Sequence, residues 1–332
     1  MRLTGRVLAG VFFLSAATAA LLFYSFRERP PEPRGLLIYA PAPQVELLPV
    51  YLGVALGSFE TAGLDLHVVY AAEEKPTRKQ PALNAWQLED VIYARTLGNE
   101  SSVVVWILTQ QEYAVLLGRE PEPFAWEKTC RKSIITAEPT SATTAILEEL
   151  LRQNNVYPHR EATLMQNIPP ELRIPVFLAG TGSYLVAPEP AATLLVQKKQ
   201  AFPAAPLTLD APVPRTVLAA PEGEARSNRA VIKAFNQVLA GACNHLYARP
   251  AGEIAWVVGP CFPHLSLPTL EKVIARGQQE RIWSTDGKAD PAHFNRLQEI
   301  LKRAGELPRP LACEEVFWGQ KSEAGSQKSE IE

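Results

Sequence analysis

A strand–helix–strand pattern near the start of the chain constrains the fold more than any other feature. Residues 36–39 form a short apolar run, residues 46–56 carry apolar side chains at helical spacing, and residues 64–70 alternate and are rich in β-branched side chains. Gly57 follows the helical segment, where a glycine suits a C-terminal cap. Two strands joined by a helix are typical of a parallel sheet, so we expect an α/β protein.

The same kind of pattern continues through most of the chain and then changes to helices. The further expected elements are a helix at 83–97, strands at 103–108, 114–118 and 133–136, helices at 141–154 and 170–178, strands at 183–187 and 216–219, and helices at 227–247, 250–258, 268–276 and 290–303. Two α/β runs followed by helices predict two lobes, each a mostly parallel sheet flanked by helices. We expect residues 36–110 plus 215–319 in one lobe and 120–205 in the other.

The overall composition is that of an ordinary globular protein with a small-molecule or protein partner. The chain has 332 residues, of which 47% are hydrophobic and 20% charged. Its net charge of −2 gives no sign of a nucleic-acid partner. The length suffices for two medium-sized lobes.

The two ends of the chain differ from the rest. Residues 1–30 resemble a targeting segment, because Arg2 and Arg6 precede a run without charges at 7–26. A run of about 20 apolar residues is long enough to span a bilayer, so the segment is either a retained signal anchor or a cleaved signal peptide. Either places the remainder outside the cytoplasm. The segment 320–332 is polar, and we expect it to be disordered.

The four cysteines, Cys130, Cys243, Cys261 and Cys313, contain no C-x-x-C pair. A zinc ribbon or a thioredoxin-like site is therefore not expected. Export permits disulfides, and Cys243 and Cys261 flank the expected helix at 250–258, so one possibility is a bridge between them. The alternative is four buried thiols.

No set of residues points to catalysis. The five histidines are scattered along the chain, and no glycine-rich phosphate loop is present. We therefore predict no enzyme activity, no catalytic residues, no metal site and no cofactor.

Four stretches, taken in order, are similar to one family of binding proteins. They are Leu48-Pro49-Val50-Tyr51-Leu52-Gly53 with Gly57-Ser58-Phe59 and Ala62-Gly63-Leu64-Asp65-Leu66; Ile135-Thr136-Ala137-Glu138-Pro139-Thr140-Ser141; Phe177-Leu178-Ala179-Gly180 with Glu189-Pro190-Ala191; and Cys261-Phe262-Pro263-His264-Leu265-Ser266 with Ile282-Trp283 and Ala304-Gly305-Glu306-Leu307. Together they resemble the nitrate/sulfonate/taurine and pyrimidine-precursor solute-binding family. The likeness covers roughly residues 36–319. Ser183 stands where the family usually has Asp, and Thr140 where it often has Gly.

The resemblance implies a two-lobed, type II periplasmic-binding-protein fold. It also implies a role in capturing a small molecule for an ABC importer, with a permease and an ATPase as partners. A membrane-tethered extracytoplasmic sensor or scaffold with the same fold and no transport role is the alternative. Some relatives of this fold are pyrimidine-synthesising enzymes, but their cysteine cluster and cytosolic setting are missing here.

Three loops that follow predicted strands supply the candidate ligand-binding residues. They are Gln44 and Glu46 after the first strand, Thr140 and Ser141 after the strand at 133–136, and Glu189 after the strand at 183–187. Ligands in open α/β folds bind at the carboxyl ends of strands and at helix N-termini. Glu46, Glu138 and Glu189 around one cleft would disfavour an anion, so we expect a neutral or cationic ligand.

Overall fold

The computed structural model describes residues 34–71, 80–98 and 101–319. By its contacts the chain falls into a unit of residues 1–34 and a unit of residues 35–332. The predicted signal segment at 1–30 and the predicted disordered tail at 320–332 lie outside the described residues. In the part of the chain that is described, no helix is both long enough and apolar enough to cross a membrane.

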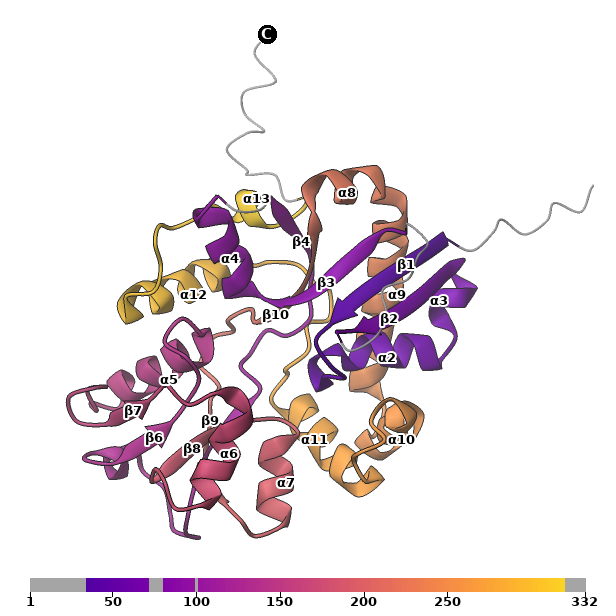
Figure 1. The fold of residues 1–332 in the computed structure, drawn as a ribbon. Coiled ribbons are helices and arrows are strands. Elements are labelled where there is room, and N and C mark those ends of the chain that lie inside the picture. The colour runs from indigo at the N-terminus through magenta and orange to yellow at the C-terminus, as the bar shows by residue number, and fades with distance from the viewer. Residues whose placement is uncertain (1–33, 72–79, 99–100, 320–332) are drawn as a thin grey trace, which may run out of the picture. The chain divides into compact units, whose positions relative to one another are not determined.

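The strands of the described residues form two sheets of five strands each (Figure 1). Sheet 1 contains β1 (Arg34–Ala40), β2 (Leu64–Tyr70), β3 (Ala82–Gln87), β4 (Ser102–Ile107) and β10 (Thr216–Pro221), in the order β2-β1-β3-β10-β4. Sheet 2 contains β5 (Ala114–Gly118), β6 (Ser133–Ile135), β7 (Thr163–Met165), β8 (Tyr184–Pro188) and β9 (Phe202–Pro206), in the order β7-β6-β8-β5-β9.

Both sheets are mixed, each with one strand antiparallel to its neighbours, and the predicted two-lobed α/β fold is confirmed. In sheet 1, β1 and β3 are parallel, but β10 runs antiparallel to both β3 and β4. In sheet 2, β6 is parallel to β7 and β8, but β5 runs antiparallel to β8 and β9. The antiparallel strands β5 and β10 are those that follow the two passages of the chain between the sheets.

Helices flank both sheets. They are α2 (Leu48–Ala55), α3 (Ser58–Thr61), α4 (Leu88–Thr96), α5 (Ala142–Gln153), α6 (Pro170–Leu178), α7 (Ala191–Gln197), α8 (Glu222–Ser227), α9 (Arg229–Ala248), α10 (Ala251–Val258), α11 (Leu267–Gln279), α12 (Pro291–Ala304) and α13 (Cys313–Val316), with short 3₁₀ helices at Val45–Leu47, Trp126–Thr129 and Gly259–Cys261. Helix α12 begins and ends as its sequence indicates, because Asp290 caps its first turn and Gly305 ends it with φ 84°.

The helix predicted at 83–97 is wrong in its first half. Residues Ala82–Gln87 form β3, which lies between β1 and β10 in the middle of sheet 1, and α4 begins only at Leu88. In the strand, Leu83 and Ala85 are buried while their neighbours along the chain are half-buried. The good helix propensity of Ala, Leu and Gln is overridden here by pairing with strands on both sides.

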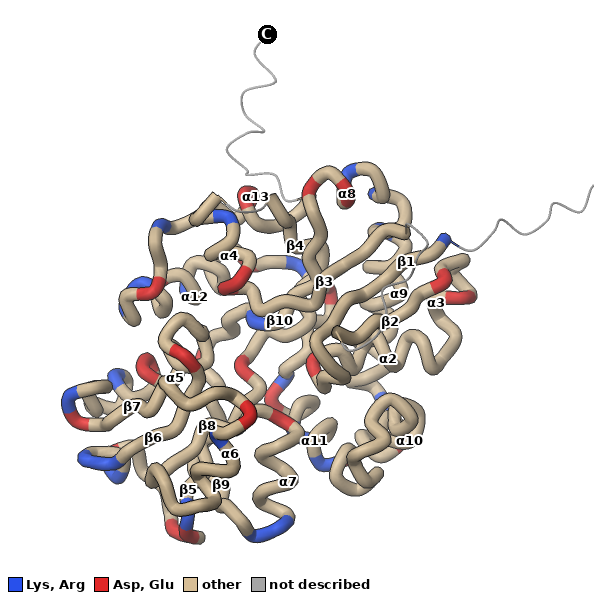
Figure 2. Tube along the Cα trace, in the orientation of Figure 1, with Lys and Arg blue, Asp and Glu red and all other residues tan. Residues whose placement is uncertain are grey.

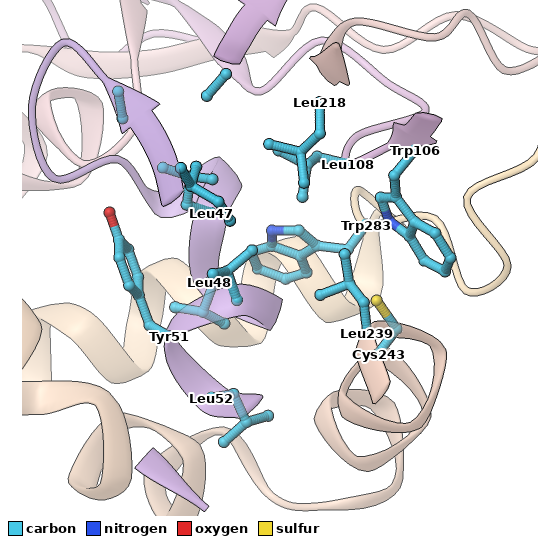
Figure 3. Close-up of a cluster of buried hydrophobic side chains, with 14 of the residues drawn as sticks. Leu47, Leu48, Tyr51, Leu52, Trp106, Leu108, Leu218, Leu239, Cys243 and Trp283 are labelled. Atoms are coloured by element: carbon cyan, nitrogen blue, oxygen red, sulfur yellow. The ribbon is translucent and has the colours of Figure 1, made fainter. Parts of the chain in front are cut away.

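A large apolar cluster packs sheet 1 against α2, α9 and α11. Figure 3 shows Trp283 lying among Leu47, Leu48, Leu108 and Leu239. The Trp283 side chain is fully buried, and its Nε1 donates a hydrogen bond to the Val45 carbonyl at 3.1 Å. This cluster holds the loop after β1 against the rest of sheet 1.

A second apolar cluster includes residues from the sides of both sheets. It contains Leu88 of α4 and Leu297 of α12, which belong with sheet 1, and Ile146 of α5, which belongs with sheet 2. At the edge of this contact, Arg303 Nη1 of α12 lies 2.7 Å from Glu149 Oε1 of α5. The two lobes therefore share buried apolar surface beside the passages that connect them.

The predicted bridge between Cys243 and Cys261 is absent, because all four cysteines are free thiols. Cys243 is buried in α9, where burial, together with Asp286, raises its pKa to about 12. Cys261 is half-buried in a 3₁₀ helix and lies within electrostatic range of Tyr51. The two thiols thus have different neighbours in the cluster.

Candidate functional site

A small cavity lies where the ends of both sheets meet. Its volume is about 210 Å³. Gln87 at the end of β3 and Thr216 at the start of β10 line it from sheet 1, and Pro188 at the end of β8 lines it from sheet 2. Glu46, after β1, and Ser141, before α5, complete opposite sides. The cavity therefore has walls from both lobes.

A buried ion-pair cluster forms one wall of this cavity. The guanidinium of Arg215, 4% exposed, donates from Nη1 and Nη2 to the carboxylate of Glu89 at 2.6 and 3.1 Å. Its Nε donates to Glu112 at 2.8 Å, and the Thr143 hydroxyl donates to the same Glu112 oxygen at 3.0 Å. Burial alone would lower the pKa of Arg215, but Glu89 and Glu112 together raise it. The charge of Arg215 is thus fully paired within the protein.

Helix α5 begins beside this cluster, and protein groups accept hydrogen bonds from its first N–H groups. A carboxylate oxygen of Glu89 accepts from Ala142 N at 2.9 Å. The Ser141 hydroxyl accepts from Thr143 N at 3.3 Å, and the Ser141 carbonyl accepts from Thr144 N at 3.0 Å. Because Glu89 lies on α4, beside sheet 1, the bond to Ala142 joins the two lobes.

The carboxyl group of Glu46 also lines the cavity but does not belong to this ion-pair cluster. It is half-buried in the 3₁₀ helix Val45–Leu47 and, among the described residues, forms no ion pair and no hydrogen bond with another side chain. Burial raises its pKa from 4.5 to about 7, and repulsion from Glu112 and Glu189 adds to this, against the opposing effects of its own backbone N–H and Arg215. Near neutral pH, Glu46 is therefore a group that gains or loses its proton readily.

Hydrogen-bond acceptors in the cavity are less fully used than donors. The amide nitrogen of Gln111 donates to the Leu209 carbonyl at 3.2 Å, while its buried amide oxygen has no hydrogen-bond partner. The guanidinium of Arg173 is paired with Glu138 at 2.6 Å. Figure 2 shows that acidic and basic positions are interspersed along the trace, with acidic positions on both α4 and α5. A molecule that donates hydrogen bonds suits this cavity better than one that accepts them.

Three of the five predicted ligand-binding residues lie at cavities. Glu46 and Ser141 line the cavity between the sheets. Gln44 instead lines a neighbouring cavity of about 610 Å³ above sheet 1, and the two cavities share Gln87 as a wall residue. The hydroxyl of Ser141 also caps the N-terminus of α5 by accepting a hydrogen bond from Thr143 N.

The other two predicted residues line neither cavity. Thr140 is exposed, and its carbonyl accepts a hydrogen bond from the Tyr93 hydroxyl at 3.0 Å. Glu189 is fully buried and lies 2.6 Å from Arg276 of α11. It also accepts from the backbone N–H and the hydroxyl of Thr193 at 3.1 and 2.6 Å, so it caps α7. Its contacts join α7 to α11.

Sequence reasoning missed the residues that carry most of the charge at the site. Arg215 and Glu112 lie in the two passages between the sheets, Arg215 directly before β10 and Glu112 shortly before β5. Glu89 follows β3, which was not recognised as a strand. Position along the chain could have identified Arg215 as a site residue. It follows Pro214, between a proline-rich passage and an expected strand, and two lobes must meet at such a place.

We expect Glu46→Gln to change the pH dependence of stability. The folded-state pKa of about 7 is above the ordinary value of 4.5, so the native state holds an extra proton between these pH values. Wild-type stability should therefore fall as pH rises through this window. Glu46 is half-buried, so solvent screens part of the unfavourable effect of its charge. The variant should therefore be more stable than wild type by about 1–3 kcal/mol at pH 8 and equally stable at pH 4.

Urea denaturation at pH 4, 6 and 8 measures this difference. Glu60→Gln, an exposed substitution in α3, is the matched control and should show no pH-dependent gain. An equal effect of Glu46→Gln at all three pH values would contradict the raised pKa.

No family model matches the chain. A Bacillus subtilis (strain 168) protein, YtlA, described as a binding protein, is 24% identical over 271 residues, covering 79% of this chain and 81% of YtlA. Among solved structures, the ligand-binding component of an ABC-type import system from Staphylococcus aureus has a TM-score of 0.66 and 13% identity, covering 86% of this chain and 95% of that one. The periplasmic aliphatic sulphonate-binding protein SsuA of Escherichia coli has a TM-score of 0.64 and 14% identity, covering 87% and 98%.

The same fold also occurs in an enzyme. The desulfurization enzyme DSZB has a TM-score of 0.62 and 14% identity to this chain, covering 86% of this chain and 96% of DSZB. Likeness at this level of identity establishes the fold, and both binding proteins and an enzyme share it. The resemblance noted in the sequence is confirmed by these structures: the chain has the two-lobed α/β fold of the periplasmic solute-binding proteins.

Proposed function

We propose that this protein is an extracytoplasmic solute-binding protein that captures a small organic molecule in the cavity between its sheets. The observation that carries the proposal is the carboxyl group of Glu46, which lines that cavity without an ion-pair partner among the described residues. The likeness in fold to SsuA and to the Staphylococcus aureus import component supports a binding role. Concave sites with a few convergent polar groups are the usual places for ligands.

We propose a cationic or neutral molecule with hydrogen-bond donors as the ligand. Glu46 offers an acceptor, whereas the guanidinium groups of Arg215 and Arg173 are already paired. A cation beside Glu46 would also relieve the repulsion from Glu112. Among the described residues that line the cavity, an anion would find no unpaired cation, and it would be repelled by these carboxylates.

Of the predicted contacts, Glu46 is the group we propose to bind the ligand directly, with Ser141 beside it. Gln44 would take part only for a ligand that extends past Gln87 into the neighbouring cavity. Thr140 and Glu189 would contribute by holding the loop before α5 and the start of α7 in place.

Binding of a cation should depend on pH through Glu46. The ionised carboxylate binds a cation and the protonated group does not, so with a pKa of about 7 the affinity should be about tenfold higher at pH 8 than at pH 6. Native mass spectrometry of the purified protein identifies a bound molecule, and isothermal titration of that molecule at both pH values measures the change. Glu46→Gln should bind more weakly and without this pH dependence.

The direction of the pH effect shows whether the ligand donates to the ionised carboxylate of Glu46, as proposed, or accepts from its protonated form. A neutral ligand that accepts a hydrogen bond from the protonated carboxyl group would bind more tightly at pH 6 than at pH 8. Affinity that is the same at both pH values, in wild type and in Glu46→Gln alike, would remove Glu46 from the site.

We further propose that the ligand is passed to an ABC importer, with a permease and an ATPase as partners, and that residues 1–30 hold the protein at the outer face of a membrane or direct its export. Closure of the two lobes around the ligand would be the signal that the permease recognises. Cross-linking of the protein to a permease encoded beside it, dependent on ligand, tests this step.

A membrane-tethered sensor or scaffold is the second candidate. The contacts of α12 with α5, and of Arg276 with Glu189, favour it, because protein groups alone join the two lobes there. A gene neighbourhood that encodes a histidine kinase in place of a permease and an ATPase would support this candidate over transport.

A further inference from the structure

The carboxylate of Glu89 sits where two anion-binding groups converge. Glu89 is 2% exposed, and its two oxygens receive two bonds from Arg215, at 2.6 and 3.1 Å. One of the same oxygens accepts from Ala142 N, in the first turn of α5, at 2.9 Å. A guanidinium fork and a helix N-terminus are each favourable positions for a carboxylate, phosphate or sulfonate group.

These two groups come from opposite sides of the cavity. Arg215 precedes β10 of sheet 1, and Ala142 begins α5 beside sheet 2. Two further donors of these groups are also occupied, since Arg215 Nε bonds Glu112 and Thr143 N bonds the Ser141 hydroxyl. A free anion entering the cavity would therefore find this position filled by the protein itself.

We propose that Arg215 and the N-terminus of α5 form a latent anion site, for a small carboxylate or a similar anion, that Glu89 permanently occupies as a built-in ligand. The part of this proposal that concerns solute choice rests on the proposed function: by filling the site, Glu89 excludes anionic solutes and leaves Glu46 as the group that selects the ligand. The bond from Ala142 N to Glu89 also connects α4 to α5 without any solute.

Acetate is the matched probe for this site. Glu89→Ala keeps Cβ and removes the two-carbon fragment that carries the carboxylate, so acetate replaces the deleted atoms. We expect Glu89→Ala to melt roughly 5–10 °C below wild type, because Arg215 loses its bidentate partner and Ala142 N its acceptor. Sodium acetate should restore part of this loss, beyond any effect of sodium chloride at equal ionic strength.

The controls separate a site from a general salt effect. Wild type should show no acetate-specific shift, because its site is full. Glu149→Ala removes another buried carboxylate of α5, which pairs with Arg303 away from the helix N-terminus, and should also show none. In isothermal titration, acetate should bind Glu89→Ala and not the double variant Glu89→Ala/Arg215→Ala.

The experiment uses the full chain and does not require that the cavity ligand be known. If Glu89→Ala does not fold in chloride, recovery of folded protein on refolding in acetate replaces the melting temperature as the readout. No gain in acetate over chloride, or an equal gain in Glu149→Ala, overturns the latent site. Failure of the cavity to bind any solute, with acetate rescue intact, would instead count against the proposed function alone.

Discussion

Replacing Arg215 with alanine should lower the free energy of unfolding by about 3–5 kcal/mol. The guanidinium is the shared partner of Glu89 and Glu112, and all three side chains are nearly or fully buried. Its removal leaves two carboxylates close together without a counter-charge, and burying an unpaired charge costs several kcal/mol. The loss should be smaller at low pH, where protonated carboxyl groups no longer need the cation.

Urea denaturation of the variant and of Arg226→Ala gives the comparison. Arg226 also pairs with a glutamate, Glu222, but its side chain is 75% exposed and sits on the surface of α8. Exposed pairs of this kind contribute about 0–1 kcal/mol, so this control should be close to wild type. Equal losses of unfolding free energy in the two variants would show that the Arg215 cluster stabilises the protein no more than an exposed ion pair does.

Replacing Trp283 with alanine should cost about 3–5 kcal/mol. The side chain is fully buried among Leu47, Leu48 and Leu108 (Figure 3), and its removal would leave a large void in this cluster. The Val45 carbonyl would also lose the hydrogen bond from the indole N–H. Val45 precedes Glu46, so the same change should loosen the loop that carries the cavity carboxyl group.

Trp256→Ala is the matched control, because Trp256 is 74% exposed on α10. It should change the free energy of unfolding by less than about 0.5 kcal/mol. Denaturant titration with circular dichroism detects both changes. A loss for Trp283→Ala no larger than that of the control would contradict the packing described around the indole.

Local sequence signals predicted the elements whose environment agrees with their own propensity. Helix α12 has an N-cap, a proline in its first turn and a terminal glycine, and it forms where these residues place it. β3 was missed because Ala82–Gln87 carries residues that favour helices, and only the strands on either side of it make a strand the better choice. That information is not local to the segment.

The candidate site likewise contains residues that local sequence predicts and residues that it does not. Glu46 and Ser141 follow from their places after β1 and β6, since loops at strand ends meet at one edge of a sheet. The pairing of Arg215 with Glu89 joins residues 126 positions apart and depends on how the two lobes meet. No periodic pattern along the chain predicts that contact. The sequence therefore indicated acidic residues at the cleft, but not Arg215 or the two further carboxylates, Glu89 and Glu112, with which it pairs.

The most direct test of a solute site at Glu46 is native mass spectrometry of the protein incubated with small amines and small neutral amides. We predict a one-to-one complex of wild type with at least one of these molecules, with the same occupancy in Glu60→Gln and a clear loss in Glu46→Gln. A wild-type protein that retains none of them, or a Glu46→Gln variant with undiminished occupancy, would contradict the proposal that this cavity captures a solute through Glu46.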